Sequence, residues 1–400
     1  MSALYFYDDA RARQFEPFAL TRPVSELRAG ASLIRKRWER ATSLPSAGFI
    51  SSPHLAQFAE GSAPGAAPAK TEIPAGSILI NSRCVIPLDV KLESFDLLMC
   101  QGMACAVRLA RSMPVSQFAD GVVDIGSIQT SLGGRKVDGR WMAEVWDFVG
   151  MLAEQLVEDI PHRAASLKLR TSLDTSVIGA GKVFVEEGAV IAPNVVLDTT
   201  DGPILIRTGS VIAPFTYLVG PLVVGRDSQI LGDRVAASSI GAHSKIRGEF
   251  SSSIVLGYSN KGHAGFVGHS YLGRWVNLGA LTTTSNLKNT YSPVQLWTPN
   301  GVKNTELQFL GAFFGDHSMT GIGTMLNTGT VIGTGANVFG STMPPKVVPP
   351  FAWGESEPYE TYDVTKFLEV AGRVMARRDV ELTDKARKQL AEAHKRRWKS

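Results

Sequence analysis

The chain has 400 residues, of which 44% are hydrophobic and 20% are charged, and its formal net charge is +4. This composition is typical of a globular protein with two or three domains, and so small a charge argues against a nucleic-acid partner. No apolar stretch approaches a membrane span and the N-terminus lacks a signal-peptide pattern, so we expect a cytoplasmic protein with no membrane partner. We also expect Cys84, Cys100 and Cys105 to be buried thiols, because they lack metal-ligand spacing.

The first part of the chain has the pattern of an α/β domain. Short apolar runs at residues 4–7 and 78–81 predict strands. The spacing of apolar residues predicts helices over 32–40 and 146–160. Because strands and helices alternate, we predict an α/β sandwich over residues 1–165.

Aliphatic residues recur at every sixth position between residues 168 and 345. This period fits neither an α-helix nor simple strand alternation, and it is typical of a solenoid with three flat faces per turn. The predicted inward positions form three runs: Ile178, Phe184, Val190 and Val196; Ile206, Ile212, Leu218, Val224 and Ile230; and Phe314, Thr320, Leu326, Ile332 and Val338. The hexads break at about 247–266 and 281–309, where we expect outward loops.

The last part of the chain is predicted to be helical. Prolines at 344, 345, 349 and 350 end the hexads. Apolar residues between 364 and 375 then follow helical spacing, and a second helix is expected to start near Thr383. We therefore predict a C-terminal helical extension over residues 346–400.

The segment 260–286 is the strongest candidate for chemistry. It places His263 in a glycine-rich loop, with Asn277 and Asn286 on the following coils. Acyl transfer from a thioester to a sugar amine requires a base, and a histidine titrates near neutrality. It also requires donors for an oxyanion, which amide groups supply, and a groove for the acyl donor.

Two resemblances sharpen this hypothesis. The hexads resemble the hexapeptide-repeat family, which implies a left-handed parallel β-helix and a trimeric acyltransferase. Gly262-His263, the block 276–280 and Asn286 resemble the acetyltransferase half of the bifunctional family that makes UDP-N-acetylglucosamine. That resemblance implies acetyl-CoA as donor, glucosamine 1-phosphate as acceptor and His263 as base. It further implies Asn277 and Asn286 as sugar-phosphate contacts, and Ala280 as part of the CoA groove.

Three further residues are candidates on their position alone. We predict that Lys261 and Lys288 supply positive charge to a sugar phosphate, and His317 is read either as lining the CoA site or as a plain coil corner. The sequence departs from the family pattern at Phe266, Leu281 and Leu287, which leaves the identity of the acceptor open.

By position, the first domain corresponds to the nucleotidyltransferase half of the same family. That half holds a triphosphate on a glycine-rich loop and a metal ion on an aspartate after a strand. Here the loop has no glycine and Arg83 follows the strand, so a cation lacks its oxygen ligand there. The candidate phosphate ligands are instead four arginines, Arg11, Arg13, Arg22 and Arg28.

Two interpretations of this domain stay open. In the first, it transfers a nucleotidyl group from UTP or another nucleoside triphosphate, with Mg²⁺ held by Asp8 or Asp9. In the second, it binds a sugar nucleotide without turning it over. For the whole chain we expect a homotrimeric sugar-phosphate transferase, with a nucleotidyltransferase alone or a silent sugar-nucleotide-binding protein as the alternatives.

Overall fold

The computed structural model describes residues 2–128, 134–172 and 174–398. The chain forms two compact units. Unit 1 comprises Met1–Asp147 with Thr383–Arg396, and unit 2 comprises Phe148–Leu382 with Arg397–Ser400. The sequence division at residues 165 and 345 stays a prediction about domains. Within the described ranges, no helix is both long and apolar enough to cross a membrane.

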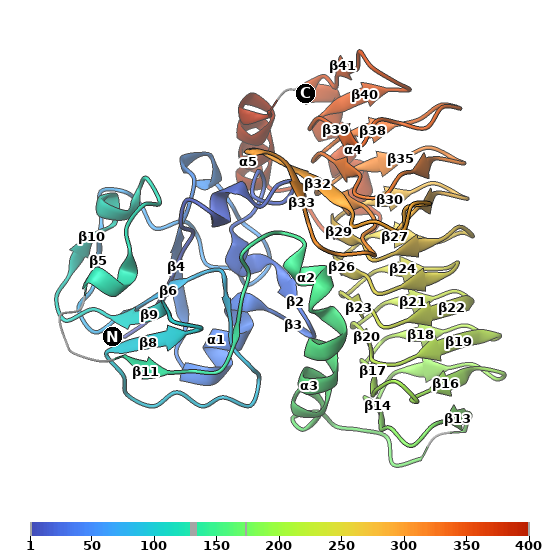
Figure 1. Ribbon diagram of the computed structural model, residues 1–400, viewed down its shortest axis with the longest axis horizontal. Helices are drawn as coiled ribbons and strands as arrows, with labels where there is room; N and C mark the ends of the chain where they lie inside the picture. Colours follow the sequence, from blue (N-terminus) through green and yellow to red (C-terminus); the bar gives the residue numbers. More distant parts are fainter. Residues whose placement is uncertain (1, 129–133, 173, 399–400) are drawn as a thin grey trace. The chain divides into compact units, whose positions relative to one another are not determined.

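Unit 1 is built on a six-stranded mixed sheet. In spatial order its strands are β11 (Arg135–Lys136), β8 (Leu97–Cys100), β9 (Met103–Arg108), β6 (Ile78–Asn81), β1 (Leu4–Tyr7) and β4 (Ser46–Ile50). β1 runs parallel to β4 and β6, whereas β9 is antiparallel to β6 and β8. The two strands predicted from apolar runs are therefore confirmed, and they pair with each other in the sheet, of which β4, β6, β8, β9 and β11 are labelled in Figure 1.

Smaller elements complete unit 1. They are the strand pairs β2 (Arg28–Ala29) with β3 (Ser32–Leu33), β5 (Glu72–Ile73) with β10 (Met113–Pro114), and β7 (Cys84–Val85) with β12 (Arg140–Trp141), and the helices α1 (Ile34–Thr42) and α5 (Asp384–Arg396). The predicted helices at 32–40 and after Thr383 are confirmed within two residues. All three cysteines are buried free thiols, as expected.

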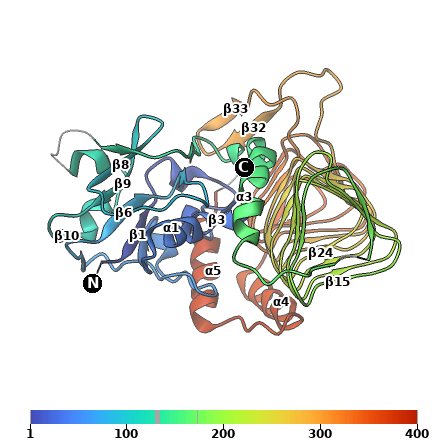
Figure 2. The same cartoon turned by 90° about the horizontal axis from the view of Figure 1, so that it is seen from below.

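Unit 2 is a parallel β-solenoid with three sheets, and its coils superimpose into a three-sided outline when viewed end-on (Figure 2). The first sheet contains β13 (Ser176–Ile178), β16 (Val196–Asp198), β19 (Thr216–Val219), β22 (Asp233–Ala236), β25 (Phe250–Ser251) and β28 (Val267–Gly268). The second contains β14 (Val183–Val185), β17 (Ile204–Ile206), β20 (Leu222–Val224), β23 (Ser239–Ile240), β26 (Ile254–Gly257), β29 (Tyr271–Arg274), β34 (Phe313–Phe314), β37 (Val331–Ile332) and β39 (Val347–Val348). The third contains β15 (Val190–Ile191), β18 (Val211–Ile212), β21 (Gln229–Ile230), β24 (Lys245–Ile246), β27 (Asn260–Lys261), β30 (Asn277–Leu278), β35 (Met319–Thr320), β38 (Asn337–Val338), β40 (Ala352–Gly354) and β41 (Glu360–Thr361).

The remaining elements of unit 2 flank the coils. They are the pairs β31 (Thr283–Thr284) with β36 (Met325–Leu326) and β32 (Gln295–Thr298) with β33 (Gly301–Asn304), and the helices α2 (Asp147–Gly150), α3 (Leu152–Ala164) and α4 (Val364–Ala376). The helix predicted over 146–160 is interrupted at Met151, whose φ of −100° and ψ of 5° lie outside the helical region. The predicted fold class, with its α/β region, β-solenoid and C-terminal helices, is confirmed.

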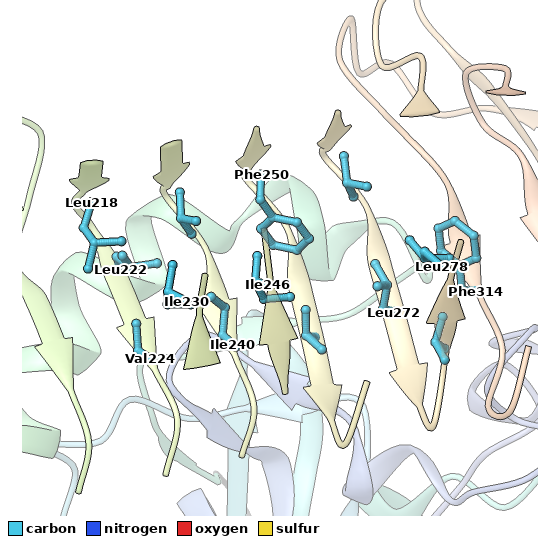
Figure 3. Close-up of a cluster of buried hydrophobic side chains, with 14 of the residues drawn as sticks. Leu218, Leu222, Val224, Ile230, Ile240, Ile246, Phe250, Leu272, Leu278 and Phe314 are labelled. Carbon is cyan, nitrogen blue, oxygen red and sulfur yellow. The ribbon is translucent and has the colours of Figure 1, made fainter. Parts of the chain in front are cut away.

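Hydrophobic side chains, most of them aliphatic, fill the inside of the solenoid and stack from coil to coil (Figure 3). The second predicted run lies entirely in this core, and so does the third apart from its polar member. Thr320, that exception, is buried and its hydroxyl bonds that of Thr282 at 2.8 Å. The polar side chain is therefore satisfied inside the core rather than turned outward.

The first predicted run is wrong by one residue. Val185, Ile191 and Leu197 face or adjoin the core, whereas Ile178 and Val190 are about half exposed. Strand pairing explains the error, because Leu197 rather than Val196 pairs with the inward Leu218. A shift of one residue along a strand moves a side chain to the opposite face of the sheet.

The hexads do break within 247–266, but the outward loop expected there is wrong, because β25, β26 and β27 continue the coils through it. Val211 pairs with Gln229, eighteen positions on, but Lys245 pairs with Asn260, only fifteen positions on. A shortened coil disrupts the count of six without interrupting the strands. The break at 281–309 does contain an outward excursion, the hairpin of β32 and β33.

Candidate functional site

The glycine-rich loop lies directly after β27 on the third sheet of the solenoid. His263 is exposed there, and within the described chain no residue hydrogen-bonds its imidazole. Gly265 has a φ of +120°, and a Cβ at this position would lie 2.4 Å from the carbonyl oxygen of Thr282 on the next coil. The loop can therefore pack this tightly only with a glycine at that position.

Lys261 supports this loop from inside the solenoid. Its side chain is buried, and Nζ donates to the carbonyl oxygens of His263, Ala264 and, at 3.4 Å, Arg247. Burial lowers the pKa of Lys261 to about 8. All three ammonium donors face backbone oxygens, so the structure places this predicted phosphate ligand beneath the loop rather than in contact with solvent.

A cavity of about 460 Å³ opens beside His263, and Asn277 lines the same cavity. Asn277 lies one coil away, because β30 pairs with β27 at Asn260. Nδ2 of Asn260 donates to Oδ1 of Asn277 at 2.8 Å. This hydrogen bond fixes which way the Asn277 amide points and leaves its Nδ2 donor for a ligand.

The rest of the cavity is aromatic and basic. Tyr258 and Trp275 line one side, with ring centroids 4.4 Å apart. Lys245 contributes from β24, and Arg377 and Arg378 contribute from the segment after α4. Burial, followed by the neighbouring Arg377 charge, lowers the pKa of Arg378. Among the described residues the lining includes no carboxylate, so the cavity carries an excess of positive charge.

The other residues predicted for this site lie outside the cavity lining. Nδ2 of Asn286 lies 2.9 Å from Nδ1 of His269, whose pKa is lowered by burial. Nζ of Lys288 donates to the carbonyl oxygen of Pro293 at 2.6 Å. The structure thus brings together His263 and Asn277 but not Asn286 or Lys288.

The two predicted CoA contacts also lie outside this cavity. The carbonyl oxygen of Ala280 accepts a hydrogen bond from the Gly323 N–H at 2.8 Å. His317 is buried, with its ring 6.2 Å from that of Trp275 and edge-on to Phe367 of α4. His317 thus adjoins the cavity through Trp275, which lines it.

A second cavity, of about 600 Å³, lies in unit 1 where β1 and β6 end. The carboxyl ends of parallel strands are a common location for ligand sites in α/β sheets. Asp9 follows β1, Asn81 ends β6, and Arg83 and Trp141 complete the polar and aromatic part of the lining. Leu97, Met99, Met103 and Val122 are among its apolar walls.

Only one of the four arginines predicted to bind phosphate lines this cavity. Arg11 does so while forming an ion pair with Glu144. Arg13 donates to backbone oxygens, including that of Ala119 at 2.6 Å, and Arg22 is buried against Glu60 at 2.8 Å. Arg28 lies on the short strand β2. Arg13, Arg22 and Arg28 thus do not converge with Arg11 on one ligand site.

Comparison with known proteins gives a family match for the first part of the chain and two similar proteins. Residues 4–166 match the family profile described as "Sugar nucleotidyl transferase". The chain is also 27% identical over 207 residues to a "Bifunctional protein GlmU" of Methanococcus vannielii and 26% identical over 213 residues to one of Methanococcus aeolicus. These alignments cover 51% and 52% of this chain but only 44% and 45% of the relatives. The resemblance to the bifunctional family is confirmed, and the chain spans less than half the length of these relatives.

Two solved structures were also matched. Both are mutants of AntD, an N-acyltransferase from Bacillus cereus, in complex with dTDP and Coenzyme A. Sequence identities are 14% and 16%, and each match covers 53% of this chain and 99% of the other. Their TM-scores of 0.24 and 0.22 are too low to support a conclusion about this protein.

A divalent cation, which the family resemblance implies for nucleotidyl transfer, does not fit the residues of the unit 1 cavity. Both oxygens of Asp9 already accept hydrogen bonds from Arg83. Asp8 is fully buried and bonded to Ser51 and the Val24 N–H. Throughout the described ranges, no group of three or more histidine, cysteine, aspartate or glutamate side chains could hold a metal ion.

Sequence reasoning missed several lining residues. Asn260 lies within the segment 260–286, one coil before Asn277. That spacing is the signal from which contact between the two side-chain amides could have been predicted. Arg377 and Arg378 gave no such signal, because their position depends on how α4 returns to the solenoid.

Proposed function

We propose that unit 2 is an acyltransferase that moves an acyl group from acetyl-CoA to the amine of an amino-sugar phosphate, with His263 as the catalytic residue. One observation carries this proposal: His263 and Asn277 line the same cavity, and the charged side chains among its described lining residues are all cationic. An exposed imidazole with no protein partner among the described residues is free to accept a proton from a substrate.

The proposed step is an attack of the substrate amine on the thioester, with His263 as proton acceptor. The amine nitrogen attacks the thioester carbonyl carbon, forming a C–N bond, while a ring nitrogen of His263 takes the proton from the amine. The tetrahedral intermediate then breaks its C–S bond, and the CoA thiolate leaves with the proton held by His263. Nδ2 of Asn277, oriented by Asn260, donates to an oxygen of the bound substrate.

The charge of the cavity favours a phosphorylated acceptor. Lys245, Arg377 and Arg378 line it with no carboxylate among the described residues. A sugar phosphate carries up to two negative charges, and guanidinium groups bind phosphate oxygens through two parallel N–H donors. Glucosamine 1-phosphate is our proposed acceptor, and the product would serve nucleotide-sugar synthesis.

Three finer features belong to the same proposal. Ala280 and His317 are proposed contacts of CoA outside the cavity, and Asn286, Lys261 and Lys288 act only indirectly. We also propose a homotrimer, because apolar side chains that include Ile322, at 76% exposure, would be covered by a neighbouring copy.

Thiol release from acetyl-CoA in the presence of glucosamine 1-phosphate tests the proposal. We expect His263→Ala to lower kcat/KM by about a hundredfold or more, because general base catalysis contributes about 10²–10⁴-fold. His269→Ala is the matched control, because His269 lies outside the cavity and should retain most activity. Equal rates for wild type and His263→Ala would refute the assignment, and a monomer by light scattering would refute the trimer.

A further inference from the structure

The unit 1 cavity has an ion pair at its polar end. Nη2 of Arg83 lies 2.7 Å from Oδ2 of Asp9, and Nε lies 3.0 and 3.1 Å from the two carboxylate oxygens. Nδ2 of Asn81 and the N–H of Ala12 each bond Asp9 at 2.9 Å. Asp9 therefore has its charge balanced and its lone pairs occupied within the domain.

The pKa of Asp9 reflects this environment. Burial alone would raise it, but the hydrogen bonds and positive charge of Arg83, with help from Asn81 and Ala12, hold it below the ordinary value. The carboxylate is therefore ionised at neutral pH and committed to Arg83. A cation such as Mg²⁺ would have to displace a guanidinium that already satisfies both oxygens.

The other carboxylate of the lining does not restore a metal site. Asp124 is exposed, and its Oδ1 accepts the N–H of Gly126 at 2.9 Å. A hard cation takes several oxygen ligands at short range, and this lining offers one uncommitted oxygen on an exposed side chain. The family match of residues 4–166 and the chemistry of this cavity thus disagree about metal.

Arg83 itself presents charge to the cavity. Its guanidinium lies 4.7 Å from the centre of the Trp141 ring, and Nη1 donates to the carbonyl oxygen of Met142 at 3.2 Å. Among the described residues, Asp9 and Met142 together account for three of the five N–H donors, which leaves two for a ligand. Arg11 brings a second guanidinium to the same lining.

We propose that unit 1 binds a phosphate ester of a sugar or nucleotide directly on Arg83, which takes the place of a divalent cation, and that binding requires no metal. Asp9 positions Arg83 and does not touch the ligand. This inference goes beyond the acyl transfer proposed for unit 2 and does not depend on it.

Charge balance limits the strength of this binding. Arg11 and Arg83 are offset in the lining by Asp9 and Asp124, so directed N–H donors rather than net charge hold the phosphate. The cavity volume of about 600 Å³ is within the range of small-ligand sites. The apolar walls, with Trp141, can receive the remainder of a sugar or nucleoside.

Calorimetric titration of the full chain tests the proposal directly. The probes are UDP-N-acetylglucosamine and glucosamine 1-phosphate, each titrated in EDTA and again in Mg²⁺. Because the acceptor cavity of unit 2 can also bind glucosamine 1-phosphate, the comparison uses Arg83→Ala in a His263→Ala, Arg377→Ala background. We expect at least one probe to bind equally with and without metal, and Arg83→Ala to weaken that binding at least tenfold (about 1.4 kcal/mol).

Binding that requires Mg²⁺, binding unaffected by Arg83→Ala, or no binding of either probe would overturn the proposal. Tighter binding of UDP-N-acetylglucosamine would identify the ligand as a nucleotide, and tighter binding of glucosamine 1-phosphate would identify it as a sugar phosphate.

A metal-binding measurement gives an independent readout. Wild-type protein should bind no Mn²⁺ at this site by electron paramagnetic resonance. Arg83→Asp should gain Mn²⁺ binding, because it frees Asp9 and adds a second carboxylate. Arg83→Asp combined with Asp9→Asn should lose that gain. Stoichiometric Mn²⁺ binding by the wild type that Asp9→Asn abolishes would contradict the inference.

Discussion

The two cavities of this chain handle charge in opposite ways. In unit 1, Arg83 and Arg11 pair with Asp9 and Glu144, so each cation has a carboxylate in contact. In the unit 2 cavity, the cations have no carboxylate among the described lining residues, and His263 stands exposed. Our two proposals follow from this difference: directed binding on paired cations in unit 1, and attraction of an anion beside an exposed histidine in unit 2.

The largest expected effect concerns Asp8, the fully buried carboxyl of unit 1. Burial raises its pKa from 3.8 to about 6, although Ser51, Ser82 and the Val24 N–H partly oppose this. Between these two pH values the folded state binds a proton that the unfolded state has released, so stability falls as pH rises. Asp8→Asn should therefore stabilise the protein at pH 8 by up to about 3 kcal/mol, but by less than about 1 kcal/mol at pH 4.

Denaturant unfolding at both pH values measures this difference. The exposed Asp89→Asn is the matched control and should show no such dependence. If Asp8→Asn increased the free energy of unfolding equally at pH 4 and pH 8, the buried charge of Asp8 would not be the cause of the increase.

The next effect distinguishes the two interpretations of Lys261. If it contacted phosphate, its loss would mainly raise KM. Because Nζ instead holds the His263 loop, Lys261→Met should lower kcat by about 10–100-fold with KM within about threefold, since unpaired buried carbonyls cost about 1–3 kcal/mol. Lys245→Met removes a cation from the cavity lining. It should therefore raise KM and leave kcat nearly unchanged. An unchanged kcat with a raised KM for Lys261→Met would restore the phosphate-contact interpretation.

A smaller effect is expected at Asn260, which orients Asn277. Asn260→Ala should lower kcat/KM by about five- to tenfold, the cost of one neutral hydrogen bond. Asn277→Ala should lower it further, and the double variant should resemble Asn277→Ala alone, because the two amides act as a unit. If the losses of kcat/KM in the two single variants instead added up in the double variant, Asn260 would act independently of Asn277.

The smallest effect is expected at the residues that the structure places outside the cavity. Lys288→Ala and Asn286→Ala should each change kcat/KM by less than about twofold. Steady-state kinetics with glucosamine 1-phosphate measure both. A tenfold rise in KM for either one would indicate a second substrate contact and make the unit 2 site larger than its cavity.

Most of the fold could be predicted because its pattern is local and repeated. Ile206, Ile212 and Leu218 are each buried because neighbouring coils impose the same environment every sixth residue. The errors occurred where that regularity ends: the first coil, which is half exposed at Ile178 and Val190, and the shortened coil between Lys245 and Asn260.

By itself, then, the sequence determined the solenoid, the two strands β1 and β6 of unit 1 and the position of His263 in a glycine-rich loop, because periodicity and glycine content are properties of neighbouring residues. Only the tertiary structure decided which side chains meet. It turned Lys261 inward, joined Asn260 to Asn277, brought Arg377 and Arg378 to the cavity, and paired Arg83 with Asp9. Such contacts depend on the packing of residues far apart in the chain, and no local pattern records that packing.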